Sequence, residues 1–227
     1  MKDSHWGKIH RVFRTRDRLF SSFRSPVADA SEEGGFPGSI REPGLEDLVL
    51  ARAGIREALE GLREALSGEI GERDLYYILF PIVAHLDEGV QTRYMGPDLS
   101  GGWAPLQREL FDTDAAGVLF YETLEDLLLK PQTLPLVFEV YYFCLHDGFC
   151  GRMVSNPAKR QEYMERLRIR IPTADLTEIF SHGGKTVGPA SSEDEISPLW
   201  LYGGALTSLL LFYFFLKFLG AHWNPVL

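Results

Sequence analysis

Residues 45–67 read LEDLVLARAGIREALEGLREALS, and their large apolar residues recur mostly every three or four positions. The apolar stripe consists of Leu45, Leu48, Ile55, Leu59, Leu62 and Leu66. Because an α-helix turns once every 3.6 residues, this spacing places the stripe on one helical face, with charged residues on the other. The stretch therefore predicts an amphipathic helix that packs against other helices.

The same helical period continues along the chain after this stretch. Further helices are predicted over residues 75–90, 106–111, 115–129, 136–145, 157–170 and 174–180, with proline and glycine between several of them. No strand-like alternation and no repeat of fixed period accompanies them. The sequence therefore predicts an all-α domain, a helical bundle whose short connections favour antiparallel neighbours.

Composition limits the kind of protein and its partners. The 227 residues are 45% hydrophobic and 24% charged, which suits one domain with a proper core. The net charge of -9 argues against nucleic acid as a partner. The two cysteines, Cys144 and Cys150, lie in apolar surroundings and are expected to be reduced thiols in a cytosolic domain.

A basic head precedes the predicted domain. Residues 1–24 space aromatic and aliphatic side chains in a helical pattern with arginines between them, which predicts a basic amphipathic helix. Residues 25–44 are rich in Pro, Gly, Ser and Glu and indicate a flexible linker, so the folded domain is placed at 45–181. The head could lie on anionic membrane lipid, bind a partner, or remain disordered.

An apolar, uncharged stretch from Ile196 to Leu216 lies near the carboxyl end. As a helix it would span roughly 30 Å, the thickness of the hydrocarbon core of a bilayer. A buried core helix is the alternative, but core helices usually keep a polar face. We therefore expect a linker at 182–197, a single C-terminal transmembrane helix at 198–220 that acts as a tail anchor, and a short tail at 221–227. The preceding domain would stay on the cytoplasmic side, where it is made.

Small residues four apart lie within this predicted span. Gly203 pairs with Thr207 and Gly204 with Ser208 in a pattern that lets two membrane helices approach closely. Self-association, or packing against the span of a partner, is therefore expected. The alternative is that small residues are simply frequent in such helices.

Catalytic motifs are weak throughout the chain. There is no nucleophile elbow, phosphate loop or dinucleotide fingerprint, and no cofactor is predicted. His85 and Glu88 share a helical face, and with His146 they could form part of a metal site in a membrane-tethered enzyme. A helical metal site needs more ligands than these on facing helices, so a protein without enzymatic activity is preferred.

Four ordered blocks in the domain resemble a known family. They are AHLDEGV at 84–90, Trp103, GVLFYETLE at 117–125, and a helix that ends CLHDGFCGR at 144–152. Together with the terminal apolar stretch they resemble the DotU/TssL family, which comprises inner-membrane subunits of type VI secretion systems and the related DotU/IcmH proteins of type IVB systems.

The resemblance implies a scaffold with a hook-like cytoplasmic domain of two small helical bundles and a transmembrane helix in the bacterial inner membrane. It also implies a TssM/IcmF-like inner-membrane partner and contact with the baseplate. The positions that it marks as partner-binding or fold-determining are Asp87, Glu88, Trp103, Glu122, Glu125, Gly148, Phe149, Gly151 and Arg152. The two roles remain open at each of them.

The chain departs from the family pattern in places. Cys150 stands where an acidic residue is expected, Met153 where an aromatic residue is common, and Ala116 beside Gly117 where a pair of glycines is usual. These differences concern contact details. The peptidoglycan-binding extension of some relatives is not seen after the span, so attachment to the cell wall is expected to come from a partner.

Overall fold

The structure is a computed structural model, and it describes residues 4–21, 23, 43–95, 102–172 and 179–180. These residues all belong to one compact unit, Met1–Gly183. The helices are α1 (His5–Phe20), α2 (Leu45–Ser67), α3 (Glu72–Tyr94), α4 (Leu106–Phe111), α5 (Ala116–Leu128), α6 (Pro135–His146), the 3-10 turn η3 (Gly151–Met153) and α7 (Pro157–Arg168). No strand occurs in these ranges, so the predicted all-α fold is confirmed for the described part of the chain.

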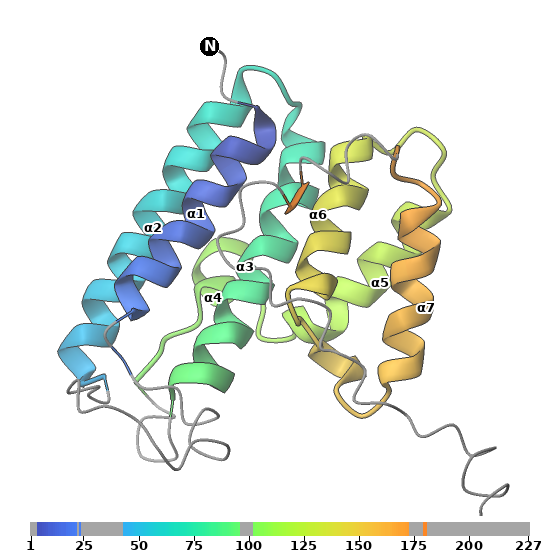
Figure 1. Ribbon diagram of the computed structural model, residues 1–227. Helices are drawn as coiled ribbons and strands as arrows, with labels where there is room; N and C mark the ends of the chain where they lie inside the picture. The colour runs from blue at the N-terminus through green and yellow to red at the C-terminus, as the bar shows by residue number, and fades with distance from the viewer. Residues whose placement is uncertain (1–3, 22, 24–42, 96–101, 173–178, 181–227) are drawn as a thin grey trace, which may run out of the picture. The chain divides into compact units, whose positions relative to one another are not determined.

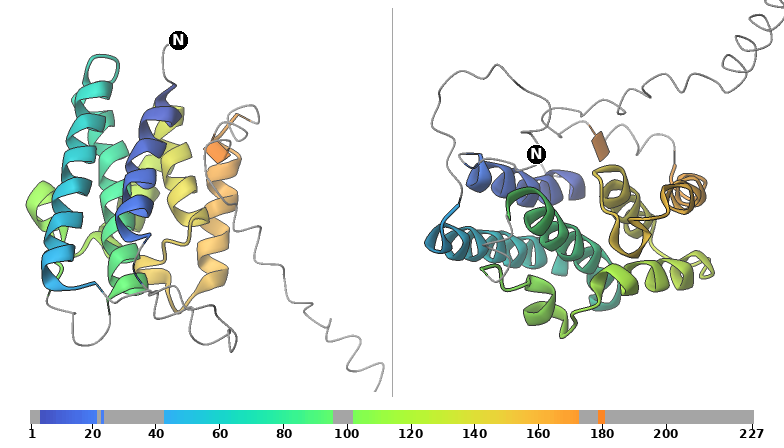
Figure 2. Two further views of the ribbon diagram at one scale, coloured as in Figure 1. Left: turned by 60° about the vertical axis from the view of Figure 1, so that its left-hand side comes forward. Right: turned by 90° about the horizontal axis from the view of Figure 1, so that it is seen from below.

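Helices α1 and α2 lie side by side, and α3 lies between this pair and α6 (Figure 1). Helix α7 packs on the other side of α6, and α5 contacts η3 (Figures 1 and 2). The short α4 packs on α3. Helix α3 is therefore the centre of the unit, and it contacts α2, α4, α5 and α6.

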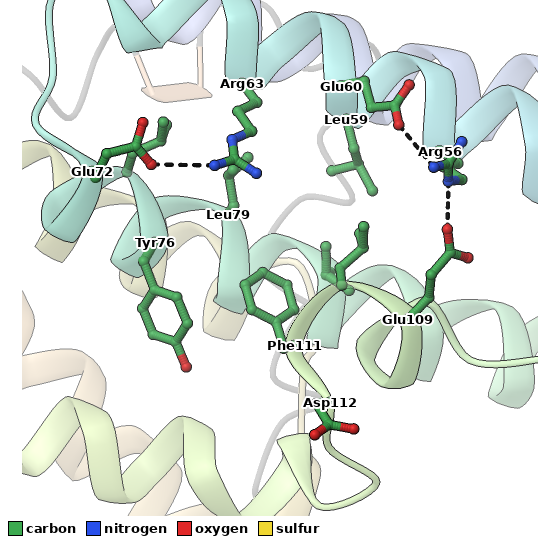
Figure 3. A pocket seen from close by; sticks show the side chains of 13 residues that line it. Arg56, Leu59, Glu60, Arg63, Glu72, Tyr76, Leu79, Glu109, Phe111 and Asp112 are labelled. Atoms are coloured by element: carbon green, nitrogen blue, oxygen red, sulfur yellow. Dashed lines mark hydrogen bonds and ion pairs between the residues drawn. The ribbon is translucent and has the colours of Figure 1, made fainter.

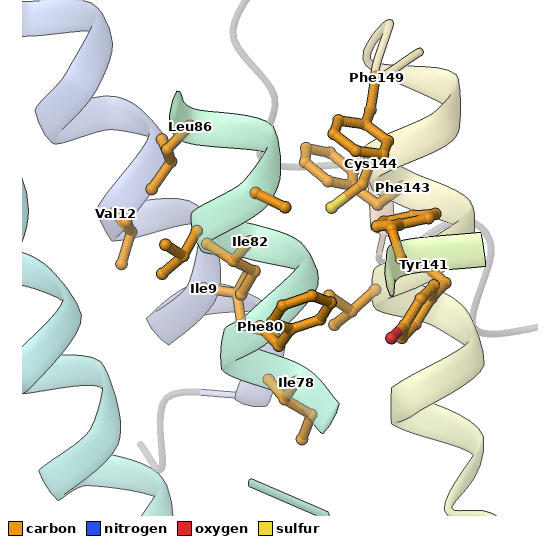
Figure 4. Close-up of a cluster of buried hydrophobic side chains, with 14 of the residues drawn as sticks. Ile9, Val12, Ile78, Phe80, Ile82, Leu86, Tyr141, Phe143, Cys144 and Phe149 are labelled. Atoms are coloured by element: carbon orange, nitrogen blue, oxygen red, sulfur yellow. The ribbon is translucent and has the colours of Figure 1, made fainter. Parts of the chain in front are cut away.

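The core is one cluster of buried apolar side chains that extends from α1 to α7. Figure 4 shows Ile9 and Val12 of α1 close to Ile82 of α3. Tyr141 and Phe143 of α6 lie on the other side of α3. Nearly the whole circumference of α3 between residues 80 and 87 is buried, because neighbours pack on several of its sides. A helix buried in this way holds its polar side chains in fixed places.

The start of the folded domain at residue 45 is corrected by the structure. A helix is present in the basic head, as predicted, but its apolar face belongs to the core: Trp6 and Phe13 are 2% and 5% exposed. Phe13 packs on Phe143 of α6 with ring centroids 4.9 Å apart. The composition of residues 25–44 suggested a separate head, and the long-range packing of α1 on α2 was not visible in the sequence.

The other predicted helix limits agree with the structure within a few residues, from α2 to α7. The helix expected at 174–180 is described only at Ile179 and Phe180, which are helical. Within the described ranges no helix combines the length and the apolar character needed to cross a bilayer. The linkers predicted at 25–44 and 182–197, the span at 198–220, its four small residues and the tail at 221–227 lie outside the described residues, apart from positions 43 and 44.

Candidate functional site

Asp87 of α3 binds three groups of the segment that leads into α4. Its carboxylate accepts hydrogen bonds from the Trp103 indole Nε1 (2.8 Å) and from the backbone N–H groups of Leu106 (2.9 Å) and Gln107 (2.8 Å). The first turn of a helix leaves its N–H groups without partners inside the helix, so Asp87 supplies the cap that α4 lacks in its own sequence. Burial raises the pKa of Asp87, whereas these hydrogen bonds favour its charged form.

Glu88, the next residue, holds the corner after α6. Its two oxygens accept hydrogen bonds from the backbone N–H groups of Cys150 (2.6 Å) and Gly151 (2.7 Å). Phe149 is 1% exposed at this corner and packs on Phe120 with ring centroids 4.3 Å apart. The neighbouring carboxylates of α3 therefore fix two different loops.

Two glycines of the corner have a conformational reason to be glycine. Gly148 and Gly151 have φ angles of 101° and 49°, which L side chains rarely adopt. A Cβ on Gly151 would lie 2.6 Å from the carbonyl oxygen of Gly117 in α5. The close approach of the corner to α5 therefore requires glycine at 151. On the α5 side, a Cβ on Gly117 would lie 3.2 Å from the Cα of Gly151, which is a tight contact.

A buried charge cluster lies beside the corner. The His85 ring donates from Nε2 to Asp147 Oδ2 (2.7 Å), and Arg16 Nη1 lies 3.5 Å from the same oxygen. Burial lowers the pKa of His85, and Arg16 and Arg93 lower it further, although Asp147 opposes them. Burial acts to raise the pKa of Asp147, but His85, Arg16 and Arg93 lower it overall. These shifts keep the His85 imidazole neutral and the Asp147 carboxylate charged.

Glu122, Glu125 and Arg152 lie at the surface near the same corner. Arg152 Nη1 lies 3.4 Å from Glu122, and Arg152 Nη2 lies 3.9 Å from Glu125, with side chains that are 30–54% exposed. The hydroxyl of Tyr163 in α7 donates to Glu125. A partner could reach these three residues and the exposed Gly148, while Asp87, Trp103 and Phe149 are buried.

The structure also shows a groove that the sequence did not indicate. It lies between α2, α3 and α4, with a cavity volume of about 560 Å³ (Figure 3). Its apolar lining includes Leu59, Leu75, Leu79, Val83 and Phe111, and Tyr76 and Leu110 are 45% and 37% exposed. The charged residues that line it are Arg56, Glu60, Arg63, Glu72, Glu109 and Asp112.

Ion pairs order this groove. Arg63 pairs with Glu72 (3.2 Å), and Arg56 bridges Glu60 (3.0 Å) and Glu109 (2.5 Å), as Figure 3 shows. The hydrogen bonds from Arg52 and Arg56 lower the pKa of Glu109. With four carboxylates and two arginines, the lining carries a net negative charge. Tyr76 directly follows Leu75 of the apolar stripe in α3, and the spacing of that stripe does not show that a groove opens beside it.

The residues of the metal-site alternative do not come together. His85 bonds to Asp147 and Glu88 to the backbone of the corner. His146 packs its ring on Phe180, with centroids 4.5 Å apart. Across the described ranges no group of three or more His, Cys, Asp or Glu side chains is placed to hold a metal ion. Cys144 and Cys150 are both free thiols, and Cys144 is buried.

Comparisons with known proteins agree with the all-helical arrangement. One solved structure, described as DotU from Francisella novicida, superposes with a TM-score of 0.56 at 19% identity. The match covers 74% of this chain and 99% of that chain, so it supports a shared fold. No curated protein matches the chain.

The family assignment comes from the sequence. The family described as "Type VI secretion system protein DotU" matches residues 40–219, which is most of the chain. The chain therefore belongs to the DotU family, and the resemblance inferred from the four ordered blocks is confirmed. The match begins close to α2, so α1 lies outside it.

Proposed function

We propose that the chain is a non-catalytic, tail-anchored scaffold subunit of a bacterial type VI secretion system. In this proposal it sits in the inner membrane with its helical domain in the cytoplasm, and it links a TssM/IcmF-like membrane protein to the baseplate. The observation that carries the proposal is the family match over residues 40–219, since the description of that family names type VI secretion. The apolar sequence from Ile196 to Leu216 supplies the expected membrane attachment.

The groove between α2, α3 and α4 supports a docking role. An apolar floor with a charged rim is typical of a surface that receives a few buried anchor side chains. Because the lining carries net negative charge, its occupant is proposed to be an amphipathic helix of a partner protein that presents apolar residues flanked by lysine or arginine. Tyr76 and Leu110 would be the main contacts.

The surface cluster of Glu122, Glu125 and Arg152 is a second candidate contact. It lies next to the corner at residues 148–151, and its side chains are exposed to solvent. Asp87, which is buried, and Glu88, which is half-buried, would then act on partners indirectly, because they position α4 and the corner.

The assembly is tested by affinity isolation of the full chain from native membranes in mild detergent, followed by mass spectrometry. The proposal expects a large TssM/IcmF-like protein and baseplate components in the isolate. A type IVB subunit, the alternative within the family, would bring down type IVB components instead. An isolate that contains this chain alone would reject the scaffold role.

The groove is tested in the same isolation by Tyr76→Glu with Leu110→Glu. We expect these substitutions to remove one partner from the isolate, because they place negative charge where apolar side chains of the partner would be buried. The matched control is Leu129→Glu, at a position that is 79% exposed and does not line the groove. Equal recovery of all partners by both variants would exclude the groove as a docking surface.

A further inference from the structure

The outward face of α1 carries a stripe of arginines. Arg11, Arg14 and Arg18 are three and four residues apart, so they follow one another along one face of the helix. All three are exposed, whereas the apolar face of α1 is buried against the rest of the unit. The stripe is thus presented by a helix that the core holds in place.

Two of the three arginines of this stripe, Arg14 and Arg18, have no acidic partner among the described residues. Asp17 is the one acid within α1, and Arg16 Nε holds it at 2.8 Å. Like charges three or four residues apart weaken a helix, so the stripe costs stability unless an anionic ligand lies against it.

A hollow runs along the same side of α1. It has a volume of about 340 Å³ and is lined on one side by Lys8, Arg11, Thr15 and Arg18. Lys8 already pairs with Glu69 at 3.4 Å, so Arg11 and Arg18 are the cations that a ligand in the hollow would meet. Glycine and alanine residues of α2, among them Gly54 and Gly61, line the other side. Glu57 is the one acidic residue of the lining. Cations and a hydroxyl beside open space form a setting that suits a phosphate group.

We propose that this arginine stripe and its hollow bind the headgroups of anionic phospholipids. The stripe is an extended array of positive charge, which complements a charged surface better than it does a single small ion. Trp6, Phe13 and Phe20 are already buried, so the contact is electrostatic and does not insert the helix into the bilayer. The net charge of -9 over the whole chain would turn other faces away from such a surface.

The proposal gives α1 a role separate from the docking of protein partners. It does not require α1 to insert into the bilayer, because the apolar face of α1 forms part of the core. The domain would be oriented on the membrane surface by Arg11, Arg14 and Arg18.

The test uses the full chain reconstituted in vesicles. A donor dye is placed on Ser21→Cys, an exposed position just after α1, and a second sample carries it on Leu129→Cys at the end of α5. Cys150 is replaced by serine in both, and acceptor dyes label the lipid headgroups. Energy transfer from position 21 should rise when phosphatidylcholine is partly replaced by phosphatidylglycerol, and it should rise more than transfer from position 129.

The stripe is then tested by Arg11→Gln, Arg14→Gln and Arg18→Gln together. Since each cation near an anionic surface contributes about 1 kcal/mol, the triple variant should lower the ratio of docked to undocked domain about 100-fold. The matched control is Arg73→Gln, Arg108→Gln and Arg168→Gln, which removes the same charge from exposed positions outside both the stripe and the groove and should keep docking. Lysine at positions 11, 14 and 18 should also keep it.

Three results would overturn the proposal. The first is equal energy transfer from position 21 with and without phosphatidylglycerol. The second is an equal loss of membrane docking in the stripe variant and the control variant. The third is a loss of docking in the lysine variant although its circular dichroism and melting match those of the parent. A stripe variant that keeps its response to phosphatidylglycerol but fails to bind an acidic protein partner would assign the stripe to that partner instead.

Discussion

Asp87 is the residue on which the connection between α3 and α4 depends. Asp87→Ala would leave the Trp103 indole and two backbone N–H groups without their acceptor in a buried place. We expect a loss of about 2–4 kcal/mol in the free energy of unfolding, measured by chemical denaturation in detergent. Asp126→Asn, at an exposed position of α5, should stay within about 0.5 kcal/mol. Equal stability of the two variants would contradict the role given to Asp87.

Gly151 and Gly61 should respond to alanine with opposite signs. Gly151→Ala forces a Cβ to 2.6 Å from the Gly117 oxygen at a φ of 49°, so we expect a loss of at least about 2 kcal/mol. Gly61 lies inside α2, where an added methyl group would meet nothing within 4 Å, so Gly61→Ala should gain about 0.5–1 kcal/mol. Thermal melting of both variants checks the pair, and a shared sign would refute the argument.

His85 makes stability depend on pH. Its pKa is lowered in the fold from the ordinary value of 6.5, so the unfolded chain binds the proton more readily. The stability from neutral His85 is present above pH 6.5 and is lost as the pH falls below that value. His85→Gln should flatten the fall in unfolding free energy between about pH 7.5 and about pH 5. An unchanged slope in this variant would mean that His85 is not held neutral.

The sequence pointed to Asp87 and Glu88 but did not show which groups they bind. Asp87 and Glu88 were singled out by resemblance as partner-binding or fold-determining, and the structure shows carboxylates bonded to backbone N–H groups of other segments. Such a bond depends on which loop a distant part of the chain brings near. The spacing of residues along α3 carries no information about that loop.

At the scale of the element, α1 is the part that the sequence analysis placed wrongly. Periodicity correctly predicted its helix and its apolar face. The composition of residues 25–44 then suggested separation from the domain, although a connection of any composition permits packing. Helix limits are local properties, whereas the choice of a packing partner for α1 is set by α2, α3 and α6.

Phe13→Ala tests the place of α1 in the core. Phe13 is 5% exposed and packs on Phe143 and His85, so its truncation should cost about 3–5 kcal/mol in unfolding free energy. Arg14→Ala, at the next position, changes an exposed side chain and should cost less than about 0.5 kcal/mol. Chemical denaturation compares them, and a negligible effect of Phe13→Ala would restore a separate head.

At the scale of the whole molecule, the all-α class and the family were predictable because they rest on periodicity and on four ordered motifs. The groove between α2, α3 and α4 was not, since it depends on how far two long helices diverge and on where α4 lies. The surfaces proposed for docking differ in character: the groove is apolar with a negative rim, and the α1 stripe is positive. A scaffold that contacts a protein and a membrane needs two such surfaces.

Under the proposed scaffold role, another subunit of the secretion system docks in the groove between α2, α3 and α4 of this DotU-family domain. The most direct test places a photo-crosslinking phenylalanine at Tyr76 of the full chain in living cells, with the same group at Leu129 as the control. We predict a crosslink from position 76, absent from position 129, to another subunit of the secretion system. Crosslinks from position 76 that reach no protein, or that match those from position 129, would contradict the claim.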